Sequence, residues 1–159
     1  MAMVPQRQYV LGAAAALAFA TLVIAAALSK DDIKLLQDDG GWEYIAVSDQ
    51  EAGIQTEHVC FDGQPHPGEC SGNLRLSPDK SFAVQEAIGG ENYDRHGRYE
   101  IADDQISFFD EFGNRDGPYT IQLNAENKML VLSMPQVRLE LELESQYKED
   151  LEHKKKPPQ

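Results

Sequence analysis

Basic residues are scarce in this sequence. It has 14 Lys and Arg against 27 Asp and Glu, which gives its 159 residues a formal net charge of −13. A surface this acidic repels phosphate backbones and anionic lipid surfaces, which argues against nucleic acid as a partner. The simplest interpretation of the acidity is a well-solvated surface, and divalent cations or basic partners are weaker alternatives.

Cysteine is equally scarce, because the chain has only Cys60 and Cys70. Two cysteines at short spacing in an exported domain usually pair, and closing so short a loop stabilises a fold by about 3 kcal/mol. A Cys/His metal site with His58 and His66 is the alternative, but it would need more ligands at matching spacing. We therefore predict a Cys60–Cys70 disulfide, with no metal and no cofactor.

Catalytic motifs are missing as well. The four histidines lie in separate segments, no serine occupies a nucleophile elbow, and no glycine-rich loop could cradle a phosphate. Among 27 acidic residues, carboxylate pairs of the glycosidase kind arise by coincidence, so a hydrolase is the weakest alternative. We predict that the protein is not an enzyme.

One long uncharged run stands out at residues 9–28, YVLGAAAALAFATLVIAAAL. Its length suits a helix that crosses a bilayer. Arg7 precedes it and charged residues follow at 30–32, so the rest of the chain should lie outside the cytoplasm, in the periplasm of a Gram-negative cell. Residues 25–27 offer an Ala-x-Ala cleavage site, which would release a secreted protein. The apolar core is long for a signal peptide, so we favour an uncleaved anchor over residues 1–28.

The rest of the chain divides into three parts. Residues 29–39 form a linker stub, in which Ser29 could cap a short helix. Residues 40–146 form a β domain, and residues 147–159 a disordered, charged tail. A terminal helical turn is the alternative for residues 146–153.

The β domain shows short apolar stretches separated by turns. Along 137–144 apolar and charged residues alternate, which directs Leu139, Leu141 and Leu143 to one face and the glutamates at 140, 142 and 144 to water. The pattern predicts an all-β fold, an antiparallel up-and-down meander of about eight or nine strands closed as a barrel or packed as a sandwich. The expected strands are 42–48, 56–61, 73–77, 81–87, 97–102, 105–111, 119–124, 129–134 and 137–144.

Two motifs resemble those of small bacterial lipocalin-like (calycin-type) barrels. Gly40-Gly41-Trp42 is similar to the Gly-x-Trp that opens their first strand, and residues 97–113, GRYEIADDQISFFDEFG, look like one of their hairpins. The resemblance implies that an Arg of the last strand packs across the Trp, and Arg138 is the candidate. It implies a fold and no particular function.

An acidic loop, DEFGNRDG, contains Asp110, Glu111, Asn114 and Asp116. An EF-hand loop needs oxygen ligands at its first, third and fifth positions before a glycine, and Phe112 occupies the first of these. The EF-hand motif therefore fails. A looser cation site remains as an alternative to a solvated turn.

These features predict a membrane-tethered, extracytoplasmic binding domain, an envelope accessory protein or inhibitor whose partner is another envelope protein. The alternative is a carrier of a small apolar ligand in the barrel lumen, because the domain has enough aromatic residues to line a pocket. A lumen lined by apolar side chains would favour the carrier. A filled core with a protruding 60–70 loop would favour the protein binder.

Overall fold

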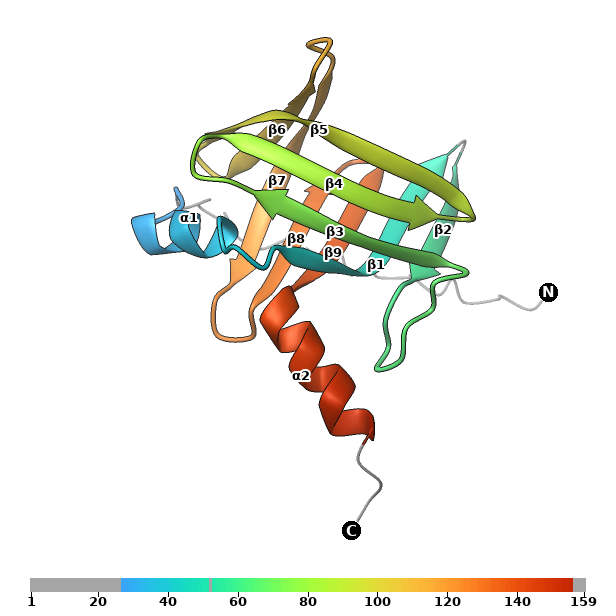
Figure 1. Cartoon of the computed structure of the whole chain (residues 1–159). Helices are drawn as coiled ribbons and strands as arrows, with labels where there is room; N and C mark the ends of the chain where they lie inside the picture. The colour runs from blue at the N-terminus through green and yellow to red at the C-terminus, as the bar shows by residue number, and fades with distance from the viewer. Residues whose placement is uncertain (1–26, 52, 156–159) are drawn as a thin grey trace, which may run out of the picture.

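The structure, a computed structural model, describes residues 27–51 and 53–155. Two helices flank a run of nine antiparallel strands (Figure 1). The elements are α1 (Lys30–Leu36), β1 (Trp42–Glu51), β2 (Ile54–Val59), β3 (Cys70–Leu76), β4 (Ser81–Ile88), β5 (Glu91–Ala102), β6 (Gln105–Asp110), β7 (Arg115–Asn124), β8 (Met129–Met134), β9 (Val137–Leu143) and α2 (Glu144–Lys155).

Eight of the strands form a closed barrel. From β3 to β9 each strand pairs with the next, β1 pairs with β3 at Trp42 and Glu43, and β1 also pairs with β9 to close the ring. The remaining strand, β2, is not part of the closed ring and, among the described residues, pairs only with the second half of β1. The predicted all-β antiparallel meander is confirmed, and the barrel is the correct alternative. This architecture is consistent with a lipocalin-like barrel.

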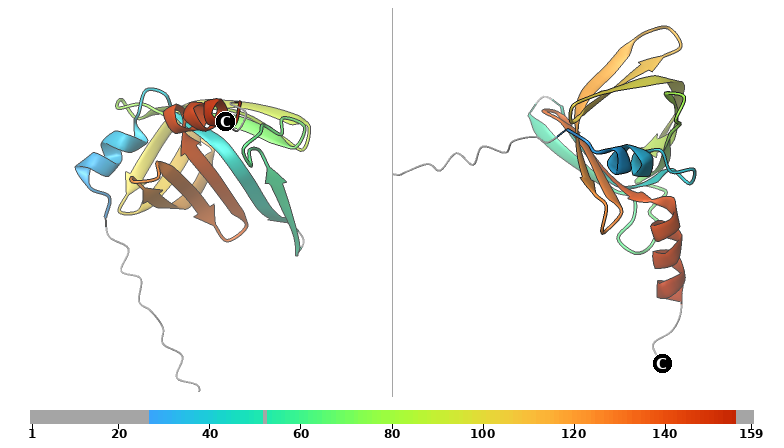
Figure 2. Two further views of the ribbon diagram at one scale, coloured as in Figure 1. Left: turned by 90° about the horizontal axis from the view of Figure 1, so that it is seen from below. Right: turned by 90° about the vertical axis from the view of Figure 1, so that its left-hand side faces the viewer.

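Helix α1 covers one end of the barrel (Figure 2, right). Ser29 caps it through a capping box with Asp32, as the sequence predicts. Leu36 is buried in the barrel core, and its carbonyl accepts a hydrogen bond from Nε1 of Trp42 at 3.1 Å. Residues 29–39 therefore form the cover of a closed end.

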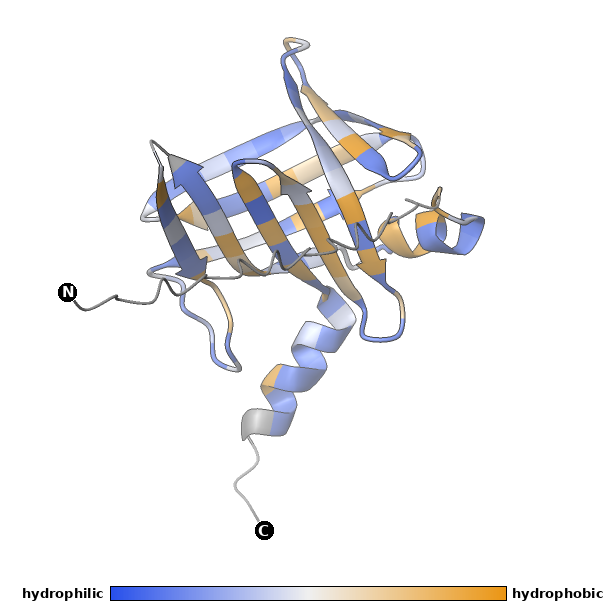
Figure 3. Ribbon diagram, turned by 180° about the vertical axis from the view of Figure 1, so that it is seen from behind, coloured by the Kyte–Doolittle hydropathy of each residue, from blue (hydrophilic) through white to orange (hydrophobic). Residues whose placement is uncertain are grey.

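Apolar and polar residues alternate along the strands (Figure 3), and the buried apolar residues form one core inside the ring. On β9, Leu139, Leu141 and Leu143 are all buried, as their spacing predicts. Glu142 differs from the expectation, since only 8 % of it is exposed. Helix α2 starts two residues later and contacts β9, which removes this outward-facing side chain from water and raises the pKa of its carboxyl.

Composition predicts a disordered tail from residue 147, but the structure has helix α2 there as far as Lys155. Tyr147 packs on Phe61 of the loop after β2, with ring centroids 4.6 Å apart. Lys148 forms an i, i+4 ion pair with Glu144 at 2.6 Å. The helix includes residues 146–153, for which a terminal helical turn was the alternative, whereas its contact with Phe61 cannot be read from composition.

The predicted disulfide between Cys60 and Cys70 is confirmed, with their Cα atoms 4.6 Å apart. It closes the loop that carries the chain from β2 to β3. The backbone N–H groups of Cys60 and Phe61 both donate to the carbonyl of Ile45, at 2.8 and 3.1 Å. The loop is thereby attached to the middle of β1.

The predicted anchor at residues 1–28 lies almost wholly outside the described residues. Of its apolar run only Ala27 and Leu28 are described, and Leu28 packs against the barrel core. Within residues 27–51 and 53–155 there is no helix with the length and apolar character needed to cross a membrane.

Candidate functional site

The barrel contains a cavity of about 460 Å³ at the end opposite α1. We call this cavity the cup. Six strands contribute to its lining, so the cup is the barrel lumen itself. Its lining residues are Val47 and Asp49 of β1, Glu86 and Ile88 of β4, Tyr93 and Arg95 of β5, Asp116 and Tyr119 of β7, Met134 of β8, and Val137 and Leu139 of β9.

A bulge in β7 directs two polar side chains into the lumen. Ile106 pairs with Tyr119 and Phe108 pairs with Asp116, so β7 has one residue more than β6 between these two pairs. Three positions of regular strand would put Asp116 and Tyr119 on opposite faces. The extra residue lies at Gly117–Pro118, and it returns both side chains to the same face.

A second bulge has the same effect on β1. Tyr44 pairs with Leu141 and Ala46 with Glu140, which leaves Ile45 as the extra residue. Tyr44 and Val47 therefore both face inward, although three positions separate them. The Ile45 carbonyl that bonds the disulfide loop belongs to this bulge.

Arg95 forms the floor of the cup with two carboxylates. One terminal nitrogen, Nη2, lies 3.0 Å from Oε1 of Glu86, and the other, Nη1, lies 2.7 Å from Oδ2 of Asp116. Only 8 % of the Glu86 side chain is exposed, so Arg95 supplies the partner that a buried carboxylate needs. The three groups join β4, β5 and β7 across the lumen.

Two tyrosines complete this polar floor. The Tyr44 hydroxyl donates to Oε2 of Glu86 at 2.7 Å, and the Tyr119 hydroxyl donates to Oδ1 of Asp116 at 2.8 Å. Burial, and then the neighbouring carboxylate, raises the pKa of each phenol well above its ordinary value. Burial opposes the charge of Arg95, but hydrogen bonding to Asp116 and the charge of Glu86 outweigh it and raise the pKa of the guanidinium. The phenols thus stay protonated as donors and the guanidinium stays charged.

A glycine makes room for one of these tyrosines. Gly72 of β3 pairs with Glu86, and a Cβ at Gly72 would lie 2.1 Å from Cδ2 of Tyr44. The ring of Tyr44 therefore passes over the bare Cα of Gly72 to reach the carboxylate of Glu86. Below the floor, aromatic and aliphatic side chains leave a void of only about 10 Å³.

The acidic loop does not assemble into a cation site. Asp110 accepts hydrogen bonds from the backbone N–H groups of Phe112 and Asn114 and from the Asn114 side chain, so it stabilises its own turn. Glu111 lies 3.8 Å from His96, and Asp116 belongs to the cup. Among the residues that the structure describes, no three His, Cys, Asp or Glu side chains gather as a metal site would require.

Trp42 and Arg138 are also placed apart. Trp42 is fully buried at the closed end and pairs with Leu143. Arg138 pairs with Ser48 at the other end of the same ladder, and its exposed side chain donates to Glu140 at 2.8 Å. The contact of the Trp is therefore with the cover helix and not with Arg138.

Sequence reasoning missed Glu86 and Arg95, and it placed Tyr44 and Tyr119 only among the aromatic residues that could line a pocket. Glu86 occupies an inward position of β4 and Arg95 an inward position of β5, where a charged residue breaks the alternation. The Gly117–Pro118 pair next to Asp116 was the available signal for the bulge, since such residues inside a strand mark irregular pairing.

No protein-family model matches the sequence, and neither does any curated protein.

Proposed function

We propose that this protein is a lipocalin-like binding protein that holds a small ligand in its cup. The observation that carries the proposal is a lumen cavity of about 460 Å³ with apolar walls and a polar floor. That volume lies in the range of small-molecule sites, and so does this combination of apolar lining with a few fixed polar groups. Eight strands are enough for a barrel to hold one small ligand.

The lining favours binding over catalysis. Among the described residues that line the cup there is no serine, threonine, cysteine or histidine. Both floor carboxylates are engaged by Arg95, so they are poorly placed to exchange protons with a substrate. We therefore propose a non-enzymatic role.

Filling the cup tests this proposal. Val137→Trp places a large side chain among the lining residues of β9, and Arg138→Trp places the same side chain on the exposed face next to it. Titration calorimetry with n-octanol, a neutral amphipathic probe, should detect binding to the parent and to Arg138→Trp but not to Val137→Trp. Equal binding to all three proteins would show that the cup is not the site.

We also propose that residues 9–28 tether the barrel to a membrane, with the cup outside the cytoplasm. The support is the uncharged run after Arg7, together with a disulfide that persists in an oxidising compartment. A reporter that is active only outside the cytoplasm, fused after Gln159, should be active. Activity of a cytoplasm-only reporter at the same position would contradict this topology.

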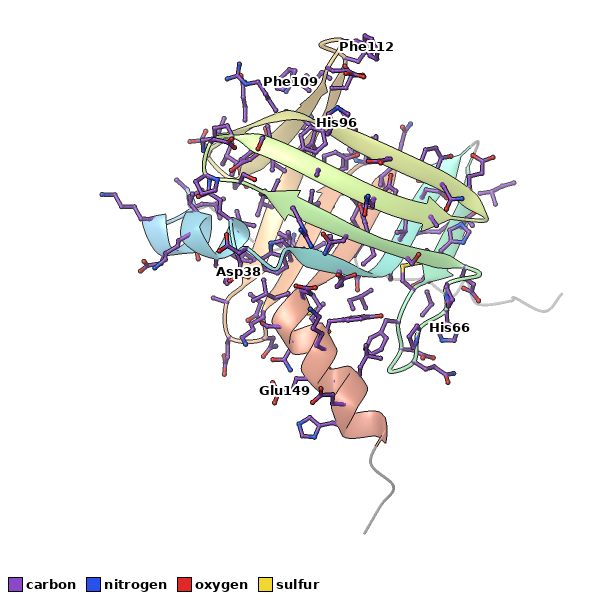
Figure 4. All side chains as sticks on the ribbon, in the orientation of Figure 1. Asp38, His66, His96, Phe109, Phe112 and Glu149 are labelled. Atoms are coloured by element: carbon purple, nitrogen blue, oxygen red, sulfur yellow. A yellow bond between two sulfur atoms is a disulfide. The ribbon has the colours of Figure 1, made fainter. Side chains whose placement is uncertain are left out.

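A protein partner in the envelope is the second candidate function, and one surface feature favours it. The β6–β7 hairpin extends beyond the barrel, and it carries Phe109 and Phe112 (Figure 4). Phe112 is 83 % exposed at the turn, which is unusual for a large apolar side chain. A partner captured by the full chain from detergent-solubilised envelope should be lost with Phe112→Ser and kept with the cup variant Val137→Trp. Capture that survives Phe112→Ser would remove the hairpin from consideration.

A further inference from the structure

The charges that line the cup are unequal in sign. Asp49, Glu86 and Asp116 contribute three carboxylates, and Arg95 contributes the one cationic group. The lining has no lysine or histidine among the described residues. The cup therefore carries an excess of two negative charges inside a wall that is otherwise largely apolar.

The one positive charge is already neutralised by the floor. Both terminal nitrogens of Arg95 donate to carboxylates, at 3.0 and 2.7 Å. Its Nε atom has no hydrogen-bond partner among the described residues, but it is buried and presents no surface to a ligand in the cup. Each terminal nitrogen of Arg95 keeps one further N–H, but an anionic ligand that approached it would also approach the carboxylates of Glu86 and Asp116.

Asp49 is the carboxylate that remains without a partner. It is half-buried in the wall of the cup on β1, and no other described residue forms a hydrogen bond or ion pair with its side chain. Ile88, Val137 and Leu139 from other strands line the same cavity. A charged acceptor beside an apolar wall can recognise a ligand that has a cationic head and an apolar body.

We propose that the cup selects a small amphipathic organic cation, such as an alkylammonium. The ammonium group binds Asp49 and lies above the negative floor, while the apolar body packs against Ile88, Val137 and Leu139. This inference rests on the proposed ligand-binding function and adds the chemical class of the ligand. A bare metal ion is a poor fit, because hard cations need several converging oxygen ligands and the cup walls are apolar.

Three probes with the same alkyl chain separate the head group from the body. Calorimetry at neutral pH and about 0.15 M salt, where long-range attraction is screened, should rank n-octylammonium as the tightest, n-octanol next and n-octanoate weakest. We expect on the order of tenfold tighter binding of the ammonium than of the alcohol, as charge-assisted hydrogen bonds exceed neutral ones.

Two variants of equal charge test the role of Asp49. Asp49→Asn should weaken n-octylammonium on the order of tenfold and leave n-octanol within about twofold. Glu57→Gln is the matched control. Glu57 pairs with Ser48, the neighbour of Asp49, so its exposed side chain lies on the opposite face of the same ribbon. Removal of the Glu57 charge should leave the binding of both probes unchanged.

Each outcome has one meaning. If the ammonium leads and only Asp49→Asn removes that lead, the proposal is supported. If n-octanol binds but the ammonium has no advantage, or n-octanoate binds best, the cation inference fails and ligand binding stands. An equal loss in Asp49→Asn and Glu57→Gln would mean a general attraction to an acidic protein, which also overturns the inference. If none of the three probes binds, the ligand-binding proposal itself fails.

Discussion

The two ends of this barrel are built from the same strands but differ in packing, since one end is filled and the other contains a cavity. At the closed end Trp42, Leu130 and Leu141 are fully buried, and α1 covers them. At the open end the same strands β1, β8 and β9 present Val47, Met134 and Val137 to a cavity. The inward positions of β8 and β9 are apolar in both halves, so alternation along these two strands does not distinguish a filled core from the lining of a cavity.

What separates the halves is the polar floor. Glu86, Arg95 and Asp116 occupy inward positions and hold one another by ion pairs across the lumen. Below them apolar side chains pack to near completion, and above them space remains. Stability should therefore depend on the closed half and ligand binding on the open half.

The largest effect should come from a charge placed in the closed half. Leu141→Asp buries an unpaired carboxylate and removes a packed side chain, which should lower the free energy of unfolding by at least about 3 kcal/mol. Val137→Asp makes the same kind of change on the same face of β9, but at the rim of the cup, and should cost no more than about 1 kcal/mol. Urea denaturation measures both. Similar losses in the two variants would mean that the halves do not differ in packing.

A pair of truncations on β8 sharpens the comparison without adding charge. Leu132 is 1 % exposed, so Leu132→Ala should leave a cavity and cost about 3 kcal/mol. Met134 points the same way two residues later but faces the cup, so Met134→Ala should cost less than about 1 kcal/mol. Thermal unfolding of the two variants decides this. A larger loss at Met134 than at Leu132 would contradict the division.

Gly72 links the two halves, because it makes room for Tyr44 beneath Glu86. Gly72→Ala should cost about 2 kcal/mol, since the new Cβ would overlap the ring of Tyr44 and force it to move. Gly68→Ala is the matched control, because a Cβ there has no neighbour within 4 Å among the described residues. Denaturant unfolding should separate them. A neutral Gly72→Ala would show that Tyr44 does not depend on that space.

The smallest effect concerns Glu142, on the outer face of the closed half under α2. Burial, with Asp150 in second place, raises the pKa of its carboxyl above the ordinary 4.5. Ionisation therefore costs more in the folded state, and the stability present at low pH is partly lost as pH rises through the raised pKa. Glu142→Gln should be more stable than the parent near pH 7, by at most about 0.5 kcal/mol, and this gain should vanish below pH 4.5. A gain that grows toward acid pH would have the wrong sign.

Sequence patterns predicted the fold well because the barrel obeys simple local rules. Each of the nine expected stretches overlaps a strand, and the alternation on β9 correctly identified Leu139, Leu141 and Leu143 as buried. The strand predictions were wrong where pairing with another strand, and not the local sequence pattern, determines the secondary structure. The polar first half of β5, residues 91–96, has no apolar pattern of its own and is held by pairing with β4.

The site was less predictable than the fold, for a geometric reason. A strand read with strict alternation puts Asp116 outside when Tyr119 is inside, and only the bulge reverses this. The partners of Arg95 lie on two other strands, at positions that only the register brings together. Spacing along one segment cannot reveal such a set.

The closure of β1 against β9 also decides where the backbone itself is exposed. In the strand order of the described residues, β2 alone has a neighbour on one side only. An unpaired edge of this kind invites a copy of the same chain to extend the sheet, which is how many β proteins aggregate. Here the edge is six residues long and contains Glu57 and His58. Shortness and charge are the usual protections of such an edge, so β2 is a poor template for edge-to-edge aggregation.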